Sequence, residues 1–231
     1  DAGQSASAWL RRWLDAAEGT RREARHGVVL AGADGANAAE GTRLLQSLGL
    51  EVRGTLFPDL SARAVARAAT AEAVVWLDPV GFGTLDDEAF VERVPVIHHH
   101  VPIGQAATLE WLARVARGLG VPGEAQKLAA VQAEFDDALA PIRDAAANKT
   151  VALVGDRGDI EALVRRSPLL DFSVARALAE LGFRVQCLVY GADTTVVTAP
   201  RPLAAGSIAF RGFQTPASLR DVLADVDLVF T

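Results

Sequence analysis

The order of strand-like and helix-like segments is the feature that most limits what this chain of 231 residues can fold into. From residue 27 onward, short runs rich in β-branched residues alternate with segments of helical periodicity, beginning with GVVLAG, AAEGTRLLQSLG and LEVRGTLF. This alternation is typical of βα units on a parallel sheet. Half of the residues are hydrophobic, which is enough for a substantial core. We therefore predict an α/β fold.

The alternation falls into two blocks, and a long amphipathic segment over residues 124–147 separates them. We expect that segment to be a helix that kinks or breaks near Pro141. Each block contains a similar helix-to-strand join, LLQSLGLEV at residues 44–52 and ALAELGFRV at residues 177–185, in which a glycine ends the helix. The join favours two Rossmann-like domains, although it is also common in other α/β proteins.

These patterns predict four consecutive regions. They are an N-terminal helical segment over 1–26, a Rossmann-like domain over 27–122, a linking helix over 123–148, and a second, incomplete Rossmann-like domain over 149–231. The first residue is not methionine and the last ones form an apolar, strand-like run, VDLVFT. We therefore expect the chain to be a portion of a longer protein.

Charge and cysteine content exclude several classes of function. The 23 basic and 29 acidic residues are interspersed, the net charge is −6, and no basic stripe alternates with aromatic residues, so we expect no nucleic-acid partner. The longest apolar runs are far shorter than the roughly 18 residues of a membrane span. Cys187 is the only cysteine, so the chain forms no internal disulfide, and we expect a cytoplasmic protein with Cys187 in its core.

Two strand-to-helix joins contain glycines at the place where helix N-termini bind phosphate. LAGADGANAAEG, with Gly32 and Gly35, lacks both the G-x-G-x-x-G spacing and a phosphate-loop lysine. VGDRGD, with Gly155, adds carboxylates that would repel phosphate, and a tight turn with an N-cap explains it. We do not expect a nucleotide site at either join.

A run of three histidines, His98, His99 and His100, ends the strand-like segment VPVIHHH. If the strand continues through the run, His98 and His100 point to one side and His99 to the other. At the carboxyl end of a parallel strand they would face the crevice in which α/β proteins bind ligands. Metal ligation, contact with a substrate or cofactor, and hydrogen bonding within the loop are the alternatives; we adopt substrate contact and assign no metal ligand. A two-histidine metal site would need a third ligand, and the acidic candidates lie on the preceding connection: Asp78, Asp86 and Asp87.

The segment WLDPVGFG, residues 76–83, forms the end of the preceding strand and its loop. Its glycines and proline would let the backbone approach a ligand closely, but an ordinary surface turn uses the same residues. Asp78 is a candidate proton donor because burial would raise the pKa of its carboxyl group. A turn or helix-cap carboxylate is the alternative.

The run from Val94 to Asp156 resembles a segment of the nitrogenase component 1 family. The matching features are short motifs in a fixed order: Val94-Pro95 before a strand, Pro102-Ile103-Gly104, Thr108 before Trp111-Leu112, the stop at Leu119-Gly120, the long helix, and Val154-Gly155-Asp156. The segments LLQSLGLEVRGTLFPDLSARAVARAATAEAVV and ALAELGFRVQCLVYG resemble flanking elements of the same family. The resemblance covers roughly residues 27–230.

The family comprises nitrogenase, its cofactor-assembly scaffolds, and the dark-operative protochlorophyllide and chlorophyllide reductases. The resemblance implies a subunit of three Rossmann-like domains, a homologous second subunit in a heterotetramer, and electrons from an ATP-dependent iron–sulfur reductase. It also implies a 4Fe–4S cluster in the complete complex, but the cysteines that hold it are not in this sequence, so this portion does not ligate the cluster. The loop that carries a cofactor-binding cysteine in nitrogenase reads LDPVGFGTLDDEAF here.

The resemblance therefore favours reduction of a tetrapyrrole, and chlorophyllide reductase in bacteriochlorophyll synthesis is our first choice because the alanine- and arginine-rich composition suits a photosynthetic bacterium with a high-GC genome. In that hypothesis, proton supply falls to Asp78, His99 and His100. Substrate contact falls to residues of the two strand-end loops and the turn after them: Trp76, Phe82, His98, His99, His100 and Gly104.

Two other functions fit the same plan. A metal- or siderophore-binding protein with two Rossmann-like domains joined by a helix would use the histidine run for zinc or iron. A cofactor-assembly scaffold of the nitrogenase family would hold a cluster without turnover. The segment P-x-G-x-x-x-T at residues 102–108 argues against the first of these.

Overall fold

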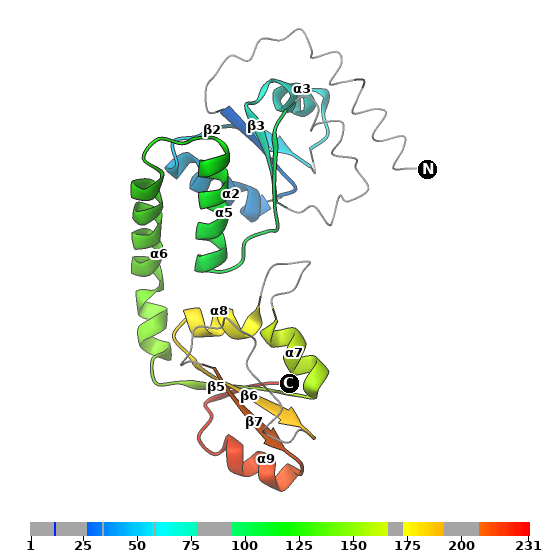
Figure 1. Ribbon diagram of the computed structural model, residues 1–231, viewed down its shortest axis with the longest axis vertical. Helices are drawn as coiled ribbons and strands as arrows, with labels where there is room; N and C mark the ends of the chain where they lie inside the picture. The colour runs from blue at the N-terminus through cyan, green and yellow to red at the C-terminus, as the bar shows by residue number, and fades with distance from the viewer. Residues whose placement is uncertain are drawn as a thin grey trace. The chain divides into compact units, whose positions relative to one another are not determined.

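The computed structural model describes residue 12 and residues 27–33, 35–57, 59–77, 94–165, 173–191 and 208–231 (Figure 1). The chain divides into two compact units. One comprises Asp1–Pro102 with Ala106–Gln132, and the other comprises Ile103–Gln105 with Ala133–Thr231. The N-terminal helix expected over residues 1–26 lies outside the described residues, apart from Arg12, which is helical.

The first unit is built on a parallel sheet of four strands in the order β2-β1-β3-β4. Its elements follow the predicted alternation: β1 Gly27–Ala31, α2 Gly35–Ser47, β2 Glu51–Leu56, α3 Ala62–Thr70, β3 Ala73–Leu77, β4 Val96–His99 and α5 Gln105–Gly118. The central strands β1 and β3 are buried along their whole length, which explains why they read as continuous apolar runs and not as alternating ones.

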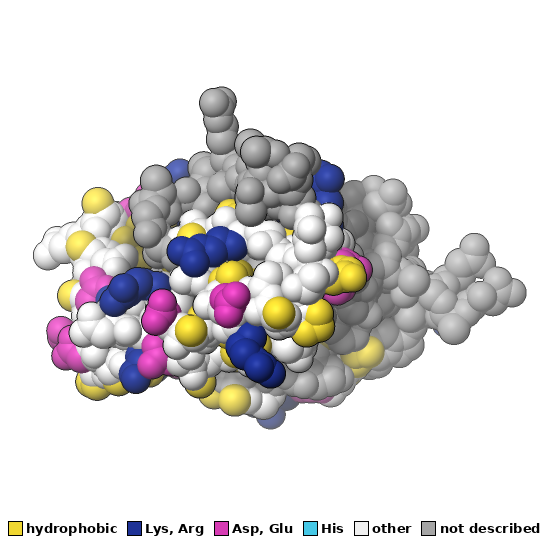
Figure 2. All heavy atoms as spheres, turned by 90° about the horizontal axis from the view of Figure 1, so that it is seen from below, with side chains coloured by type: hydrophobic (Ala, Val, Ile, Leu, Met, Phe, Trp, Pro, Cys, Tyr) yellow, Lys and Arg dark blue, Asp and Glu magenta, His cyan; other side chains and the backbone are white. Residues whose placement is uncertain are grey.

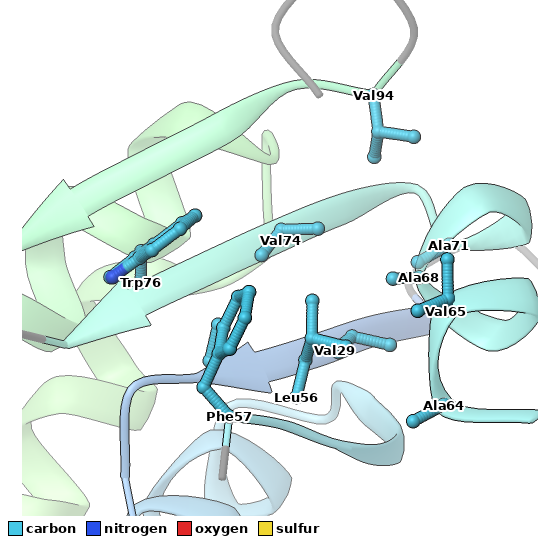
Figure 3. Packing of buried hydrophobic residues seen from close by; sticks show 11 residues of the cluster. Val29, Leu56, Phe57, Ala64, Val65, Ala68, Ala71, Val74, Trp76 and Val94 are labelled. Atoms are coloured by element: carbon cyan, nitrogen blue, oxygen red, sulfur yellow. The ribbon is translucent and has the colours of Figure 1, made fainter. Parts of the chain in front are cut away.

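Helices cover both faces of this sheet. On one face, α3 packs Ala64, Val65 and Ala68 onto Val29 and Val74 in the cluster shown in Figure 3. Ser61 caps α3, since its side chain accepts a hydrogen bond from the amide of Ala64.

On the other face, the absence of a side chain at Gly41 allows α2 to lie close to the sheet. A Cβ at that position would stand 3.0 Å from Leu30 and 3.7 Å from Leu77. It would also stand 3.8 Å from the ring of Trp111 on α5, so both helices meet the sheet at this point. Each fully buried leucine or valine there contributes about 1.5–3 kcal/mol relative to exposure.

The second unit is built on another parallel sheet, with the order β7-β6-β5-β8. Its elements are β5 Thr150–Gly155, α7 Arg157–Val164, α8 Val174–Glu180, β6 Arg184–Tyr190, β7 Ile208–Phe213, α9 Pro216–Leu223 and β8 Leu228–Phe230. In Figure 1, α7 and α8 lie on one side of this sheet and α9 on the other. Ile160 and Val164 of α7 pack with Val151, Leu153 and Cys187 of the strands into a separate core.

The long helix α6, Glu124–Ala146, connects the two sheets in the chain. Pro141 lies inside it, so the helix does not end there as a break would require. The expected pair of glycine joins is also present. Gly49 and Gly182 have φ of 80° and 95°, and in each case the amide of the next residue donates to a carbonyl five residues earlier at 3.2 Å. This closure ends a helix and turns the chain back toward the sheet.

The predicted fold class is therefore confirmed as two parallel α/β sheets with a long helix between them in sequence. No helix among the described residues is long and apolar enough to cross a bilayer. Figure 2 shows basic, acidic and hydrophobic side chains of the described residues interspersed on the face seen from below.

Candidate functional site

The carboxyl ends of β3 and β4 bring together three of the predicted site residues, Trp76, His98 and His99. The parallel register pairs Trp76 with His98 and Leu77 with His99. Because side chains alternate along a strand, Trp76 and His98 share one face of the sheet while Leu77 and His99 share the other. The expected opposite orientation of His98 and His99 follows from this register. The strand ends at His99, so alternation does not assign a side to His100.

His98 lies against Trp76 in a stacked arrangement. The two ring centroids are 5.7 Å apart and the ring planes differ by 28°. The indole is only 2 % exposed and belongs to the core under α3, where Phe57 is a further aromatic neighbour. Contact between Trp76 and a substrate, expected from the sequence, stays a prediction, since its ring contacts here are with protein side chains.

His99 is the most buried of the three histidines, at 6 % exposure. Its Nδ1 lies 2.7 Å from the backbone oxygen of His100. A carbonyl oxygen only accepts hydrogen bonds, so Nδ1 carries the hydrogen and the neutral ring leaves Nε2 as its basic nitrogen. This arrangement gives His99 a defined tautomer, in which Nε2 can take up a proton and, once protonated, deliver it.

His100 follows the last residue of β4 and is partly exposed. Its Nδ1 is buried and has no hydrogen-bond partner among the described residues. A buried polar atom without a hydrogen-bond partner costs free energy. The roles predicted for His98, His99 and His100 stay predictions.

Gly104 occupies a position whose backbone conformation favours glycine. Its φ is 87°, in the left-handed region. A Cβ there would stand 2.9 Å from Oε2 of Glu180, the flexible end of a side chain that can move aside. The next residue, Gln105, is 8 % exposed and donates to Asp136 at 3.0 Å. The predicted contact between Gly104 and a substrate stays a prediction, whereas its conformational role is evident.

The two remaining predicted site residues, Asp78 and Phe82, lie outside the described residues, as do Asp86 and Asp87. The proton-donor role of Asp78 and the substrate contact of Phe82 therefore stay predictions.

Sequence reasoning missed two features near these residues. Phe57, at the end of β2, has a φ of 56°, which is rare for a bulky side chain and has no signature in a single sequence. Arg143 donates to Asp136 at 2.8 Å, to Gln105, and to the backbone oxygen of Glu180 at 3.0 Å. The seven-residue spacing of Asp136 and Arg143, which puts them on one face of a helix, was the available signal for that pair.

The described residues contain no group of three or more histidine, cysteine, aspartate or glutamate side chains that could hold a metal ion. The iron–sulfur cluster implied by the resemblance needs cysteine thiolates. Cys187 is fully buried in β6, and that burial raises the pKa of its thiol to about 12, whereas ligand thiols are readily ionised. The residues of this chain do not fit such a cluster.

Comparisons with known proteins agree with the fold. The sequence profile of the nitrogenase component 1 type oxidoreductases matches residues 5–208. A solved structure titled "Nitrogenase Cp1 at pH 5" is similar with a TM-score of 0.52 and 16 % identity, over 97 % of this chain and 52 % of that one. A second, "Nitrogenase Cp1 at pH 6.5", has a TM-score of 0.49 and 18 % identity, over 80 % and 36 %. No curated protein sequence matches. The chain thus spans about half the length of the first structure.

Proposed function

Because the chain belongs to the family of nitrogenase component 1 type oxidoreductases, we propose that it forms part of a reductase subunit whose substrate is a planar tetrapyrrole. Chlorophyllide is the preferred substrate and protochlorophyllide the second, both in (bacterio)chlorophyll synthesis. The observation that carries the proposal is His99, whose Nδ1 is held by the backbone oxygen of His100 at the carboxyl end of β4. A proton-carrying group at that edge of an α/β sheet suits a reduction that consumes protons.

Reduction of a carbon–carbon double bond adds protons and electrons in equal number. The iron–sulfur cluster of the complete complex supplies electrons one at a time when it is bound. The part assigned to this chain is proton delivery: the Nε2 of protonated His99 donates to the substrate and is reprotonated from water. His100, which is partly exposed, and Asp78 are the further proton donors in this proposal.

The proposed activity requires more protein than this chain. A homologous second subunit in a heterotetramer supplies the cluster ligands together with parts of the complete subunit, and an ATP-dependent iron–sulfur reductase delivers the electrons. The whole complex is proposed to work in the cytoplasm. The chain itself supports these partners only through its family, since its single cysteine cannot ligate a cluster.

The test uses the full-length subunit with its partner and the reductase component, and follows chlorophyllide and protochlorophyllide by their absorption. We expect His99→Gln to lower turnover by about 10²-fold or more, which is the usual effect of losing a general acid. His100→Ala should lower turnover or substrate affinity with little loss of folded protein. Gln46→Ala, an exposed position on α2, is the matched control.

Three outcomes would contradict the proposal. Unchanged kinetics in both histidine variants would favour the alternative in which the histidines only form hydrogen bonds within their loop. Stoichiometric zinc in this chain, with no tetrapyrrole reduction, would favour the two-domain binding protein. Iron bound by the paired subunits without turnover of either tetrapyrrole would favour an assembly scaffold.

A further inference from the structure

We propose that Phe57 and Trp76 form an aromatic support that sets the orientation of the His98 ring, so that Trp76 is a positioning residue. The three rings come from the carboxyl ends of strands of one sheet: Phe57 follows β2, Trp76 lies in β3 and His98 in β4. Strands β3 and β4 are neighbours, and β1 lies between β2 and β3. The geometric part of this proposal stands by itself. Its meaning for catalysis rests on the proposed function.

The distances between the rings support a continuous series of ring contacts, tilted between Phe57 and Trp76 and stacked between Trp76 and His98. The centroids of Phe57 and Trp76 are 5.3 Å apart with ring planes at 32°, and those of Trp76 and His98 are 5.7 Å apart at 28°. Both separations lie within the range in which aromatic rings interact favourably. Figure 3 shows the rings of Phe57 and Trp76 close to each other over the sheet.

Burial fixes the inner part of the stack. Phe57 is completely buried and Trp76 is 2 % exposed, in a core that also contains Val74 and Leu56. Side chains in such cores are close-packed and sit in rotamer minima. His98 is only partly buried and lies on β4, an edge strand of the sheet. The buried indole is therefore a rigid surface against which the imidazole of the partly buried His98 rests, and both ring nitrogens of His98 are themselves buried.

The backbone at Phe57 indicates that its ring is placed there at a cost. A φ of 56° is unfavourable for a bulky side chain, and such outliers persist only where surrounding structure determines them. Here the amide of Phe57 donates to the carbonyl of Asp59 at 3.2 Å, and the carbonyl of Leu56 accepts from the amide of Gly32 at 3.0 Å. These hydrogen bonds stabilise the backbone conformation in which the Phe57 ring contacts the indole of Trp76.

The register explains why His98 and not its neighbours receives this support. Trp76 is the β3 partner of His98 in the parallel pairing, so the two side chains leave the sheet side by side on the same face. His99 pairs with Leu77 on the other face and is held instead by the carbonyl of His100. Adjacent histidines are thus oriented by different means.

The experiment compares Trp76→Leu, which removes the ring, with Trp76→Phe, which keeps an aromatic face. The first readout is the side-chain NMR spectrum of the chain, in which His98 is assigned by its loss in His98→Gln. An aromatic ring shifts the resonances of protons stacked over it. We expect W76L to shift the His98 ring resonance more than those of the other three histidines, and W76F to restore most of it.

The control is Leu45→Ala, a fully buried position on α2, which lowers stability without touching the stack. It should leave the His98 resonance in place. If W76L does not fold, Phe57→Leu replaces it, because that change withdraws support from the far side of the indole. An unchanged His98 resonance in the folded Trp76 or Phe57 variant would overturn the proposal.

The second readout is turnover by the complete complex at several substrate concentrations. Because the role predicted for His98 is substrate contact, W76L should raise KM more than it lowers kcat, and W76F should restore KM. A selective NMR shift with normal turnover in both W76L and His98→Gln would leave the stack in place and count against the proposed role of His98. An unchanged His98 resonance in W76L, together with a loss of turnover in His98→Gln, would overturn the aromatic support and favour the proposed role of His98.

Discussion

Burial determines what the single cysteine can do. Cys187 is fully buried among the apolar residues of the second core, and desolvation raises the pKa of its thiol to about 12. At pH 8 such a thiol is ionised to roughly one part in ten thousand, against roughly a quarter for an ordinary thiol of pKa about 8.5. The thiolate is the reactive species, so Cys187 is chemically silent in the folded chain.

We therefore expect thiol reagents at pH 8 to label Cys187 several orders of magnitude more slowly in the folded chain than in guanidinium chloride. The remaining labelling rate in the folded chain should be set by unfolding of the second core, because the thiol of Cys187 becomes exposed and ionised only when that core unfolds. Mass spectrometry after timed quenching measures the rate. Rapid labelling without denaturant would mean that β6 is open to solvent and that the thiol is available for chemistry.

At the scale of elements, hydrogen bonds of Asp227 connect the start of β8 to the start of β5. Asp227 accepts from Nζ of Lys149 at 2.9 Å and from the amide of Thr150 at 2.8 Å, and its own amide donates to the carbonyl of Thr150 at 2.9 Å. The hydrogen bond from Lys149, and then that from the Thr150 amide, lower the pKa of the Asp227 carboxyl group. The ionised form is thus favoured in the folded state.

The sign of the pH dependence follows from that direction. A carboxyl group whose pKa is lowered by folding stabilises the fold above its unfolded pKa of about 3.9, and this stabilisation is lost as the pH falls toward the lower folded value. We expect Asp227→Asn to be less stable than the wild type at pH 7 and to lose less stability between pH 7 and about pH 3. Urea unfolding at several pH values checks this, with Asp221→Asn on α9 as the control. Parallel pH curves for D227N and the wild type would contradict it.

The elements themselves were largely predictable because their signals are local. The periodicity that predicts a helix from residue 105 to 119 gives α5, Gln105–Gly118, and the segment from residue 124 to 147 gives α6. The two glycine joins were also predictable from local sequence. A helix commonly ends at a residue in the left-handed conformation, and glycine adopts that conformation most readily. Of the two expectations at Pro141, a kink or a break, the break is wrong because α6 continues through that residue.

The candidate site was less predictable because its contacts join distant residues. The histidine run indicated a strand end, but only the register shows that His98 meets Trp76. The contact between His99 and the carbonyl of His100 joins adjacent residues, but it depends on a side-chain rotamer, which sequence does not specify. Arg143 is again a case of distance, because its partners come from three separate segments of the chain.

On the scale of the whole molecule, the two sheets have separate cores. The cluster around Val29 and Val74 contains residues only of the first unit, whereas that around Leu153 and Cys187 contains residues only of the second. Hydrogen bonds of β-strands also stay within each sheet. Such units can open separately, with free energies of their own.

Matched core truncations test this independence. Leu30 in β1 and Leu153 in β5 are both fully buried in central strands, so Leu30→Ala and Leu153→Ala should each cost about 2–5 kcal/mol of unfolding free energy in their own unit. Hydrogen exchange followed by mass spectrometry resolves the two sheets. We expect L30A to speed exchange in β1–β4 and to leave β5–β8 near the wild-type rate, and L153A to do the opposite. Equal acceleration in both sheets by either variant would show that the sheets unfold as one cooperative unit, because the lost packing free energy would then be shared by the whole chain.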